Sequence, residues 1–346
     1  MTSPESMPAP TGLPRWLTRP LSRLYGAEVS RRNARFDRGL GVTRLDRPVI
    51  SVGNLSAGGT GKTPMVRWVV RELLRLGHHP AIAMRGYRAG RDGMSDEAAE
   101  HADALPNIPI VAQPDRISGL RALFGSDQGR GIDCVVLDDG FQHRQIARDL
   151  DIVLVDATRP FFRDALLPTG FLREPGSALG RAGAVVVTRA ERLREDDLSV
   201  VMSQCRAMVA DPSIPVVAAE MRWDRVHVYG SSPSTEPVSV LRGKRLILVT
   251  AIGNPSAFEQ AVIQAQVDIA DRLVLPDHAK FDAGVVRELS KRVAPSRASG
   301  VVTTMKDWVK LRRTDALARV GVVFVPEVSV ELSGHELHDA VCRAVS

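Results

Sequence analysis

The chain has 346 residues, of which 44% are hydrophobic and 25% are charged, and its formal net charge is +6 at pH 7. These values describe a folded globular protein with room for about two domains, and they exclude disordered and fibrous classes. The three cysteines are odd in number and too widely spaced for a zinc motif or a disulfide framework, so we expect a reducing compartment. No apolar run is long enough to span a membrane, and the N-terminus lacks the apolar core of a signal peptide.

The positive charge is concentrated near the N-terminus. Residues 11–48 hold nine arginines and three acidic residues, so the rest of the chain is close to neutral, and we expect no nucleic-acid partner. Residues 1–12 are expected to be disordered, and 13–47 to form a basic amphipathic helical segment. Its apolar stripe would consist of three leucines at helical spacing: Leu17, Leu21 and Leu24. Such a helix lies on an anionic membrane surface or packs on the protein's own core, and the two interpretations are compatible.

A glycine-rich loop follows this segment. Residues 48–54 are strand-like and 63–77 are helix-like, so the loop joins a strand to a helix. Loops of this kind point backbone N–H groups and the positive end of a helix dipole at one spot, which suits phosphate groups. The predicted phosphate-binding residues are Ser56, Ala57, Gly58, Gly59, Thr60, Gly61, Lys62 and Thr63. Lys62 would contact the β- and γ-phosphates of a nucleotide, and the Thr63 hydroxyl would bind Mg²⁺. Ser56 departs from the strict pattern, which has glycine there.

Strand-like and helix-like segments alternate from here to the end of the chain. This alternation predicts an α/β fold, namely a P-loop NTPase-like, doubly wound, largely parallel sheet with a second, smaller α/β lobe. We place the phosphate-loop lobe at 48–213 and the smaller lobe at 214–331. Strand-like segments 214–222 and 324–331 would pair as a hinge, which would return the last helix, in 332–346, to the first lobe.

Two aspartates follow the apolar strand at 132–138. Asp138 and Asp139 come at its carboxyl end, the edge at which the phosphate loop also lies, so either can hold Mg²⁺ directly or through water. The alternative is a solvated Asp-Gly turn. The upstream phosphate loop favours the metal site.

Transfer of a phosphate also needs a group that activates the acceptor. Asp96 and His278 each follow a predicted strand, and a carboxylate paired with an imidazole can accept a hydroxyl proton. Asp96 is equally suited to complement a helix dipole. Arg173 and Glu174 lie in a proline-containing loop, where they would contact phosphate and metal or form a structural ion pair. Neither Thr188–Glu191 nor Thr304–Asp307 matches a guanine-reading string, so adenine is preferred over guanine.

Taken together, these motifs resemble one family. They occur in the order Gly53–Pro64, Arg85–Tyr87, Ser95–Glu97, Asp138–His143, Leu167–Pro175, Ala251–Pro255 and Asp277–His278. The series is similar to that of tetraacyldisaccharide 4'-kinase, the lipid A 4'-kinase, over about residues 14–330. The string Asp-Asp-Gly-Phe-Gln-His beside this phosphate loop is highly specific. Ser95 stands where family members usually have glycine.

The resemblance implies an ATP- and Mg²⁺-dependent kinase that phosphorylates the 4'-hydroxyl of a tetraacyl glucosamine disaccharide 1-phosphate. Asp96 would be the base, assisted by His278. Lys62, Thr63, Asp138, Asp139 and Glu174 would hold phosphate and metal, and Arg173 would lie near the phosphates. The protein would be a monomer on the cytoplasmic face of the inner membrane, attached through its N-terminal basic helix.

Two other interpretations stay open. The chain could be a membrane-associated P-loop ATPase switch that recruits a partner, or a soluble sugar kinase whose N-terminal helix is only structural. For an ATPase switch, label from ATP would appear in free phosphate rather than in lipid. For a soluble sugar kinase, deletion of residues 1–30 would leave vesicle binding and activity on the lipid substrate unchanged.

Overall fold

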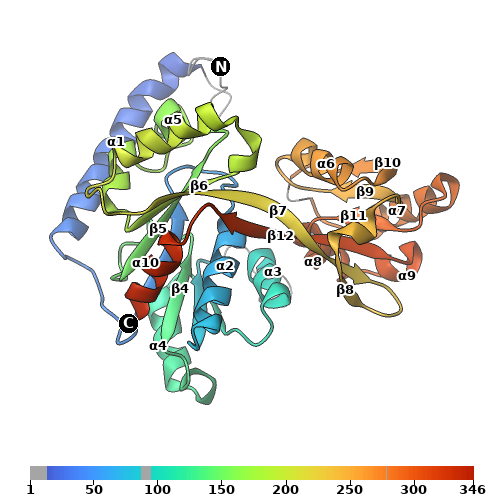
Figure 1. Ribbon diagram of the computed structural model, residues 1–346, viewed down its shortest axis with the longest axis horizontal. Helices are drawn as coiled ribbons and strands as arrows, with labels where there is room; N and C mark the ends of the chain where they lie inside the picture. The colour runs from blue at the N-terminus through green and yellow to red at the C-terminus, as the bar shows by residue number, and fades with distance from the viewer. Residues whose placement is uncertain (1–13, 87–94, 278) are drawn as a thin grey trace. The chain divides into compact units, whose positions relative to one another are not determined.

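The structure is a computed structural model that describes residues 14–86, 95–277 and 279–346 (Figure 1). The chain forms two compact units. Unit 1 comprises Met1–Tyr87, Leu105–Met221 and Val330–Ser346, and unit 2 comprises Arg88–Ala104 and Arg222–Ser329. The disorder expected for residues 1–12 and the position of His278 lie outside the described residues.

Unit 1 is built on a parallel sheet. Its strands have the order β7-β6-β5-β1-β4-β2-β3, and each pair of neighbours is parallel. The strands are β1 (Val49–Asn54), β2 (Pro80–Met84), β3 (Ile110–Ala112), β4 (Cys134–Asp138), β5 (Leu150–Asp156), β6 (Ala184–Thr188) and β7 (Val216–Tyr229). Most are continuous buried runs of valine, isoleucine and leucine, as expected for a sheet covered on both faces.

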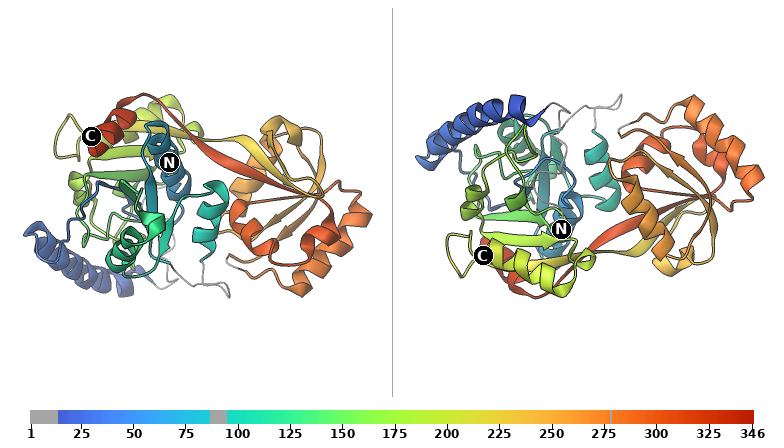
Figure 2. Two further views of the ribbon diagram at one scale, coloured as in Figure 1. Left: turned by 90° about the horizontal axis from the view of Figure 1, so that it is seen from below. Right: turned by 90° about the horizontal axis from the view of Figure 1, so that it is seen from above.

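Helices cover both faces of this sheet (Figures 1 and 2). They are α2 (Lys62–Arg75), α4 (Arg116–Gly125), α5 (Glu195–Arg206) and α10 (Glu336–Val345), whereas α1 (Arg15–Asp37) contacts the segment 165–174. α2 and α10 pack against each other and share one core with the sheet, in which Leu73, Leu337 and Val341 are fully buried. α5 and α4 cover the opposite face. Helical spacing of the apolar residues of α2 and α10 fixes which side of each helix is buried.

Unit 2 is a smaller α/β assembly. Its parallel strands are β9 (Arg245–Thr250), β10 (Asp268–Val274), β11 (Val301–Thr303) and β12 (Val323–Leu332), in the order β10-β9-β11-β12, and β8 (Ser234–Pro237) pairs antiparallel with β7. The helices are α3 (Asp96–Ala104), α6 (Pro255–Gln264), α7 (Ala283–Ser296), α8 (Met305–Leu311) and α9 (Ala316–Val320). The predicted α/β class with a doubly wound, largely parallel sheet and a second, smaller lobe is confirmed.

Two long strands run from one unit into the other. β7 and β12 are neighbours in the sheet, and each crosses the boundary between the units. The prediction that α3 belongs to the lobe 48–213 was wrong, because α3 packs against α8 and belongs to unit 2. Order along the chain did not reveal this packing.

Candidate functional site

The glycine-rich loop lies between the carboxyl end of β1 and the first turn of α2. Gly61 has a left-handed backbone (φ 85°), and a Cβ added there would lie 2.7 Å from Met221 Cε, so glycine is required. Within the described residues, the amides of Gly58, Gly59 and Thr60 donate to no protein acceptor. Ala57 differs, because its N–H donates to the Phe171 carbonyl oxygen at 2.7 Å. The Ala57 amide is therefore engaged within the protein and does not face a phosphate, whereas the amides of Gly58, Gly59 and Thr60 can donate to one.

Lys62, Asp139 and Arg173 come together beside this loop. Lys62 Nζ lies 3.6 Å from Asp139 Oδ1 and donates to Asn54 Oδ1 at 3.3 Å. Arg173 donates to Asp139 Oδ2 at 2.6 Å. Burial alone raises the pKa of Asp139, but Lys62 and Arg173 outweigh it and hold that pKa below its usual value. The two cations are thus arranged around one carboxylate, ready to face a phosphate.

Asp138 ends β4 directly beside the phosphate loop. It stands in register with Val52 of β1 and is buried, with 6% of its surface exposed. Thr63 lies in the first turn of α2. Hydroxyl and carboxylate oxygens are the ligands that Mg²⁺ prefers, so these residues fit the predicted ion.

A second set of residues, not predicted from the sequence, holds the loop. Thr188 donates to the Thr60 carbonyl oxygen at 2.9 Å, and Arg189 donates to the Gly59 carbonyl oxygen at 2.6 Å. Arg189 is in turn ion-paired with Asp156 at the end of β5. The stretch Thr188–Glu191, which does not match a guanine-reading string, therefore supports the phosphate loop through hydrogen bonds. A polar residue at the carboxyl end of a strand next to the loop was the available signal.

Arg116 and His143 were also missed as site residues. Arg116 is 3% exposed, and its Nε and Nη1 have no hydrogen-bond partner in the described part of the chain. Burial lowers its pKa, while the charges of Asp139 and Asp138 raise it. His143 is neutral near pH 7, because burial and the positive charge of Arg116 lower its pKa to about 4. A buried guanidinium with unused donors on the side of Asp138 and Asp139 is suited to an anionic ligand.

A strap, residues 165–174, connects the phosphate loop to α1. On the loop side, the Arg173 N–H donates to the Leu55 carbonyl oxygen at 2.8 Å, next to the bond from Ala57. On the α1 side, Tyr25 Oη donates to the Arg173 carbonyl oxygen at 2.9 Å, and Asn33 donates to Glu174 Oε2 at 2.7 Å.

Glu174 is fully buried and is also ion-paired with Arg181 at 2.9 Å. Both partners contact Oε2, whereas Glu174 Oε1 is buried without a hydrogen-bond partner among the described residues, so its role as a metal ligand stays a prediction. Its pairing with Asn33 and Arg181 joins α1 to the strap.

Asp96 lies in unit 2, at the start of α3. Its carboxylate oxygens lie 3.8 Å from Lys310 Nζ and 3.6 Å from Arg313 Nη1. One turn before Lys310 on α8, Lys306 lies 3.3 Å from Asp277 Oδ1. Asp277 precedes His278, which is outside the described residues. The structure thus brings Lys62, Asp139 and Arg173 together in unit 1, and describes Asp96 with its own partners in unit 2.

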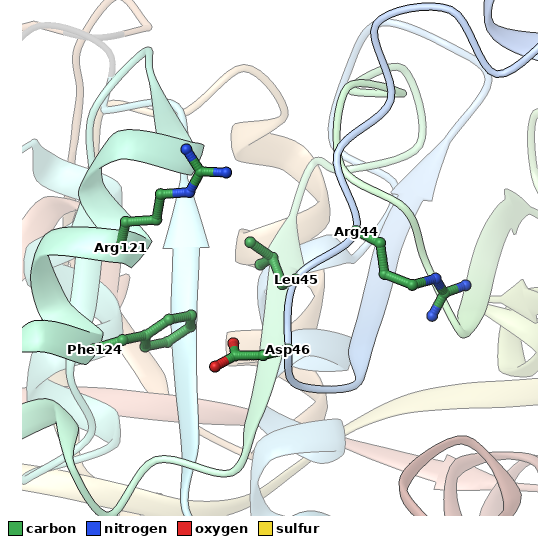
Figure 3. A pocket seen from close by; sticks show the side chains of 5 residues that line it. All are labelled: Arg44, Leu45, Asp46, Arg121 and Phe124. Carbon is green, nitrogen blue, oxygen red and sulfur yellow. The ribbon is translucent and has the colours of Figure 1, made fainter.

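A cavity of about 320 Å³ lies elsewhere in unit 1 (Figure 3). Arg121 and Phe124 of α4 face Leu45 and Asp46 of the segment before β1, whereas Arg44 points away. None of the predicted site residues lines it. The chemistry therefore belongs to the glycine loop and not to this cavity.

Comparisons with known proteins agree with this geometry. The family model described as tetraacyldisaccharide-1-P 4'-kinase matches residues 14–346. The chain belongs to this family. A tetraacyldisaccharide 4'-kinase of Anaeromyxobacter dehalogenans is 35% identical over 325 residues, covering 89% of this chain and 84% of its relative. One of Geobacter sulfurreducens is 36% identical over 307 residues, covering 83% and 82%.

A solved structure is similar over nearly the whole chain. The crystal structure of LpxK from Aquifex aeolicus in complex with ATP has a TM-score of 0.74 and 27% sequence identity, covering 96% of this chain and 99% of the other. The family resemblance found in the sequence is thereby confirmed, and the chain is an ATP-dependent kinase. Among the described residues, no helix is both long and apolar enough to cross a membrane.

Proposed function

We propose that the chain transfers the γ-phosphate of ATP to the 4'-hydroxyl of a tetraacyl glucosamine disaccharide 1-phosphate, a step of lipid A biosynthesis. The observation that carries this proposal is the meeting of Lys62, Asp139 and Arg173 beside a glycine loop whose amides have no protein acceptor. The names of its relatives support the acceptor, and the ATP complex of the Aquifex protein supports the nucleotide.

We assign Mg²⁺ to Thr63 and Asp138. Asp139 is already paired with Lys62 and Arg173, and those cations would compete with a metal for its oxygens. When bound, Mg²⁺ supplies charge neutralisation at the β- and γ-phosphates. The loop amides and Lys62 orient the same phosphates, so the chain's own groups place the γ-phosphate for in-line attack.

Asp96 is the proposed base. It would accept the proton of the 4'-hydroxyl while the hydroxyl oxygen attacks phosphorus, with His278 as the predicted assistant. Asp96 is about one-third exposed and begins a helix, so a hydroxyl can approach it. The ion pairs with Lys310 and Arg313 hold this carboxylate in place within unit 2.

The outer face of α1 is the proposed membrane contact. Trp16, Leu17, Leu21 and Leu24 are 43–74% exposed, whereas Val29 and Thr18 are buried against the rest of unit 1. The leucine stripe therefore does not pack on the protein's own core. An exposed apolar stripe with arginines beside it suits an anionic bilayer surface, and we place the protein as a monomer on the cytoplasmic face of the inner membrane.

The test is a transfer assay with ATP labelled in the γ-phosphate. Purified protein, Mg²⁺ and the tetraacyl disaccharide 1-phosphate in detergent micelles should place the label in the lipid. Label only in free phosphate would indicate an ATPase and contradict the proposal. Equal transfer to a disaccharide without acyl chains would indicate a soluble sugar kinase instead.

A further inference from the structure

α8 places a buried ammonium group beside the proposed base. Lys310 Nζ lies 3.8 Å from Asp96 Oδ2, beyond hydrogen-bond distance, and the side chain is 10% exposed. This nitrogen is buried and has no hydrogen-bond partner among the described residues. The Lys310 charge is therefore taken out of water, and in the described part of the chain Asp96 is the carboxylate that lies near it.

Such an arrangement costs free energy in the folded protein. A buried charge is normally paired and hydrogen-bonded, and an ammonium group has three N–H donors to satisfy. Elsewhere on α8, Asp307 Oδ2 accepts from Thr304, Thr250 and the Ala251 amide, whereas Asp307 Oδ1 and Trp308 Nε1 are buried without a hydrogen-bond partner among the described residues. Lys310 Nζ is the cation among the unpartnered buried atoms of α8, and it lies next to Asp96, which indicates that an oxygen of a ligand completes it.

The proposed role of Asp96 as the base indicates which ligand oxygen lies near Lys310. A hydroxyl held by Asp96 lies about 2.7 Å from the carboxylate, and the phosphorus that it attacks lies about 3–3.5 Å further on. The oxygens of that phosphoryl group are then within reach of a nitrogen 3.8 Å from the same carboxylate. Because Lys310 is buried, its charge acts in a medium that screens it weakly.

We propose that Lys310 is a further catalytic residue, which contacts an oxygen of the phosphoryl group while Asp96 holds the acceptor hydroxyl. This rests on the proposed function. In the step, the bond from the acceptor oxygen to the γ-phosphorus forms and the bond from that phosphorus to the β-phosphate oxygen breaks. The hydroxyl proton passes to Asp96, and ADP leaves with the bridging oxygen. Lys310 neutralises the charge on the transferred group and exchanges no proton.

The experiment compares Lys310→Met with Lys310→Arg in the transfer assay. Removal of one preorganised charge contact typically lowers kcat by about 100- to 1000-fold, and we expect this for Lys310→Met. KM for ATP and for the lipid should stay within about threefold, because the contact forms in the transition state. Lys310→Arg keeps a cation, and its kcat should be at least about tenfold higher than that of Lys310→Met.

Arg319→Met is the matched control, since Arg319 is a cation of unit 2 whose partner Asp315 is exposed. It should leave kcat unchanged. A kcat of Lys310→Met within threefold of wild type, or an arginine variant that folds and is no better than methionine, would overturn the proposal. If Lys310→Met does not fold, Lys310→Arg decides, with at least about a hundredth of wild-type kcat expected and a lower value counting against the proposal.

Failure of the proposed function can be distinguished from failure of the Lys310 proposal. If the wild-type chain labels no lipid, the proposed function fails whatever the Lys310 variants do. If Asp96→Asn retains full transfer while Lys310→Met loses it, the base assignment fails and the role of Lys310 stands.

Discussion

At the scale of single residues, most of the site chemistry follows from residue type and position after a strand. Lys62 and Asp139 were predicted from such patterns, and they lie together. Arg116, Arg189 and Lys310 were not predicted, because an isolated arginine or lysine in a sequence gives no indication of which carbonyl or carboxylate it will meet. Their roles depend on partners more than 50 residues away or on burial.

His143 leads to a prediction about pH. Its pKa in the folded protein is about 4, below its ordinary value of 6.5, because of burial and the nearby Arg116. The unfolded chain therefore binds the proton more readily. The stabilisation is fully present above pH 6.5 and is lost as the pH falls toward 4. We expect the free energy of unfolding to drop over this range, by about 1–2 kcal/mol from this residue after allowance for its partial exposure.

Denaturant titrations between pH 4 and 7 measure this effect. His143→Gln should flatten the pH dependence of the unfolding free energy, whereas His79→Gln, at a largely exposed histidine, should leave it unchanged. An identical slope for His143→Gln and wild type would show that His143 does not contribute.

At the scale of elements, α1 has two faces with different roles. Its inner face contacts the strap through Ser22, Tyr25 and Asn33, and the strap carries Arg173 to Asp139. α1 is thus connected to the phosphate site by hydrogen bonds of 2.6–2.9 Å. The periodicity of Leu17, Leu21 and Leu24 predicted the helix, but it did not reveal that a polar stripe would form the buried face.

Loss of these contacts should weaken ATP binding. Tyr25→Phe and Asn33→Ala each remove one hydrogen bond, worth about 0.5–1.5 kcal/mol, so we expect a roughly 2- to 10-fold higher dissociation constant for Mg-ATP by calorimetry. Leu24→Ala, on the exposed face, is the control. In a double-mutant cycle with Arg173→Lys the effects should not add. Additive effects would mean that α1 does not act through Arg173.

Membrane binding should depend on the outer face of α1. Replacement of Leu17, Leu21 and Leu24 by serine removes apolar area that would enter the bilayer, so we expect at least about tenfold weaker sedimentation with vesicles containing phosphatidylglycerol. Serine at Leu74 and Leu76, two exposed leucines at the end of α2 and just after it, is the control. Unchanged sedimentation of the α1 variant would exclude this face as the contact.

At the scale of the whole molecule, the two units carry different parts of the proposed reaction. Unit 1 holds the glycine loop with Lys62, and unit 2 holds Asp96. Binding of the nucleotide and activation of the acceptor should therefore be separable by mutation.

Asp96→Asn tests this separation. The variant should bind Mg-ATP with the affinity of the wild type, because the phosphate loop is untouched, and should transfer phosphate at least about 100-fold more slowly, because general base catalysis is lost. Lys62→Ala should lower both binding and transfer. Substantial transfer by Asp96→Asn at normal ATP affinity would remove the base assignment.

The sequence by itself determined the fold class, the phosphate loop and the family, because these depend on patterns local in the chain: buried strands, a glycine loop and the motif Asp138–His143. Only the tertiary structure showed that α3 belongs to unit 2, that Glu174 Oε2 contacts Asn33 and Arg181, and that Lys310 lies beside Asp96. The reason is that burial and long-range pairing depend on which elements pack together. Hydrophobic periodicity gives the face of an element but not its neighbour.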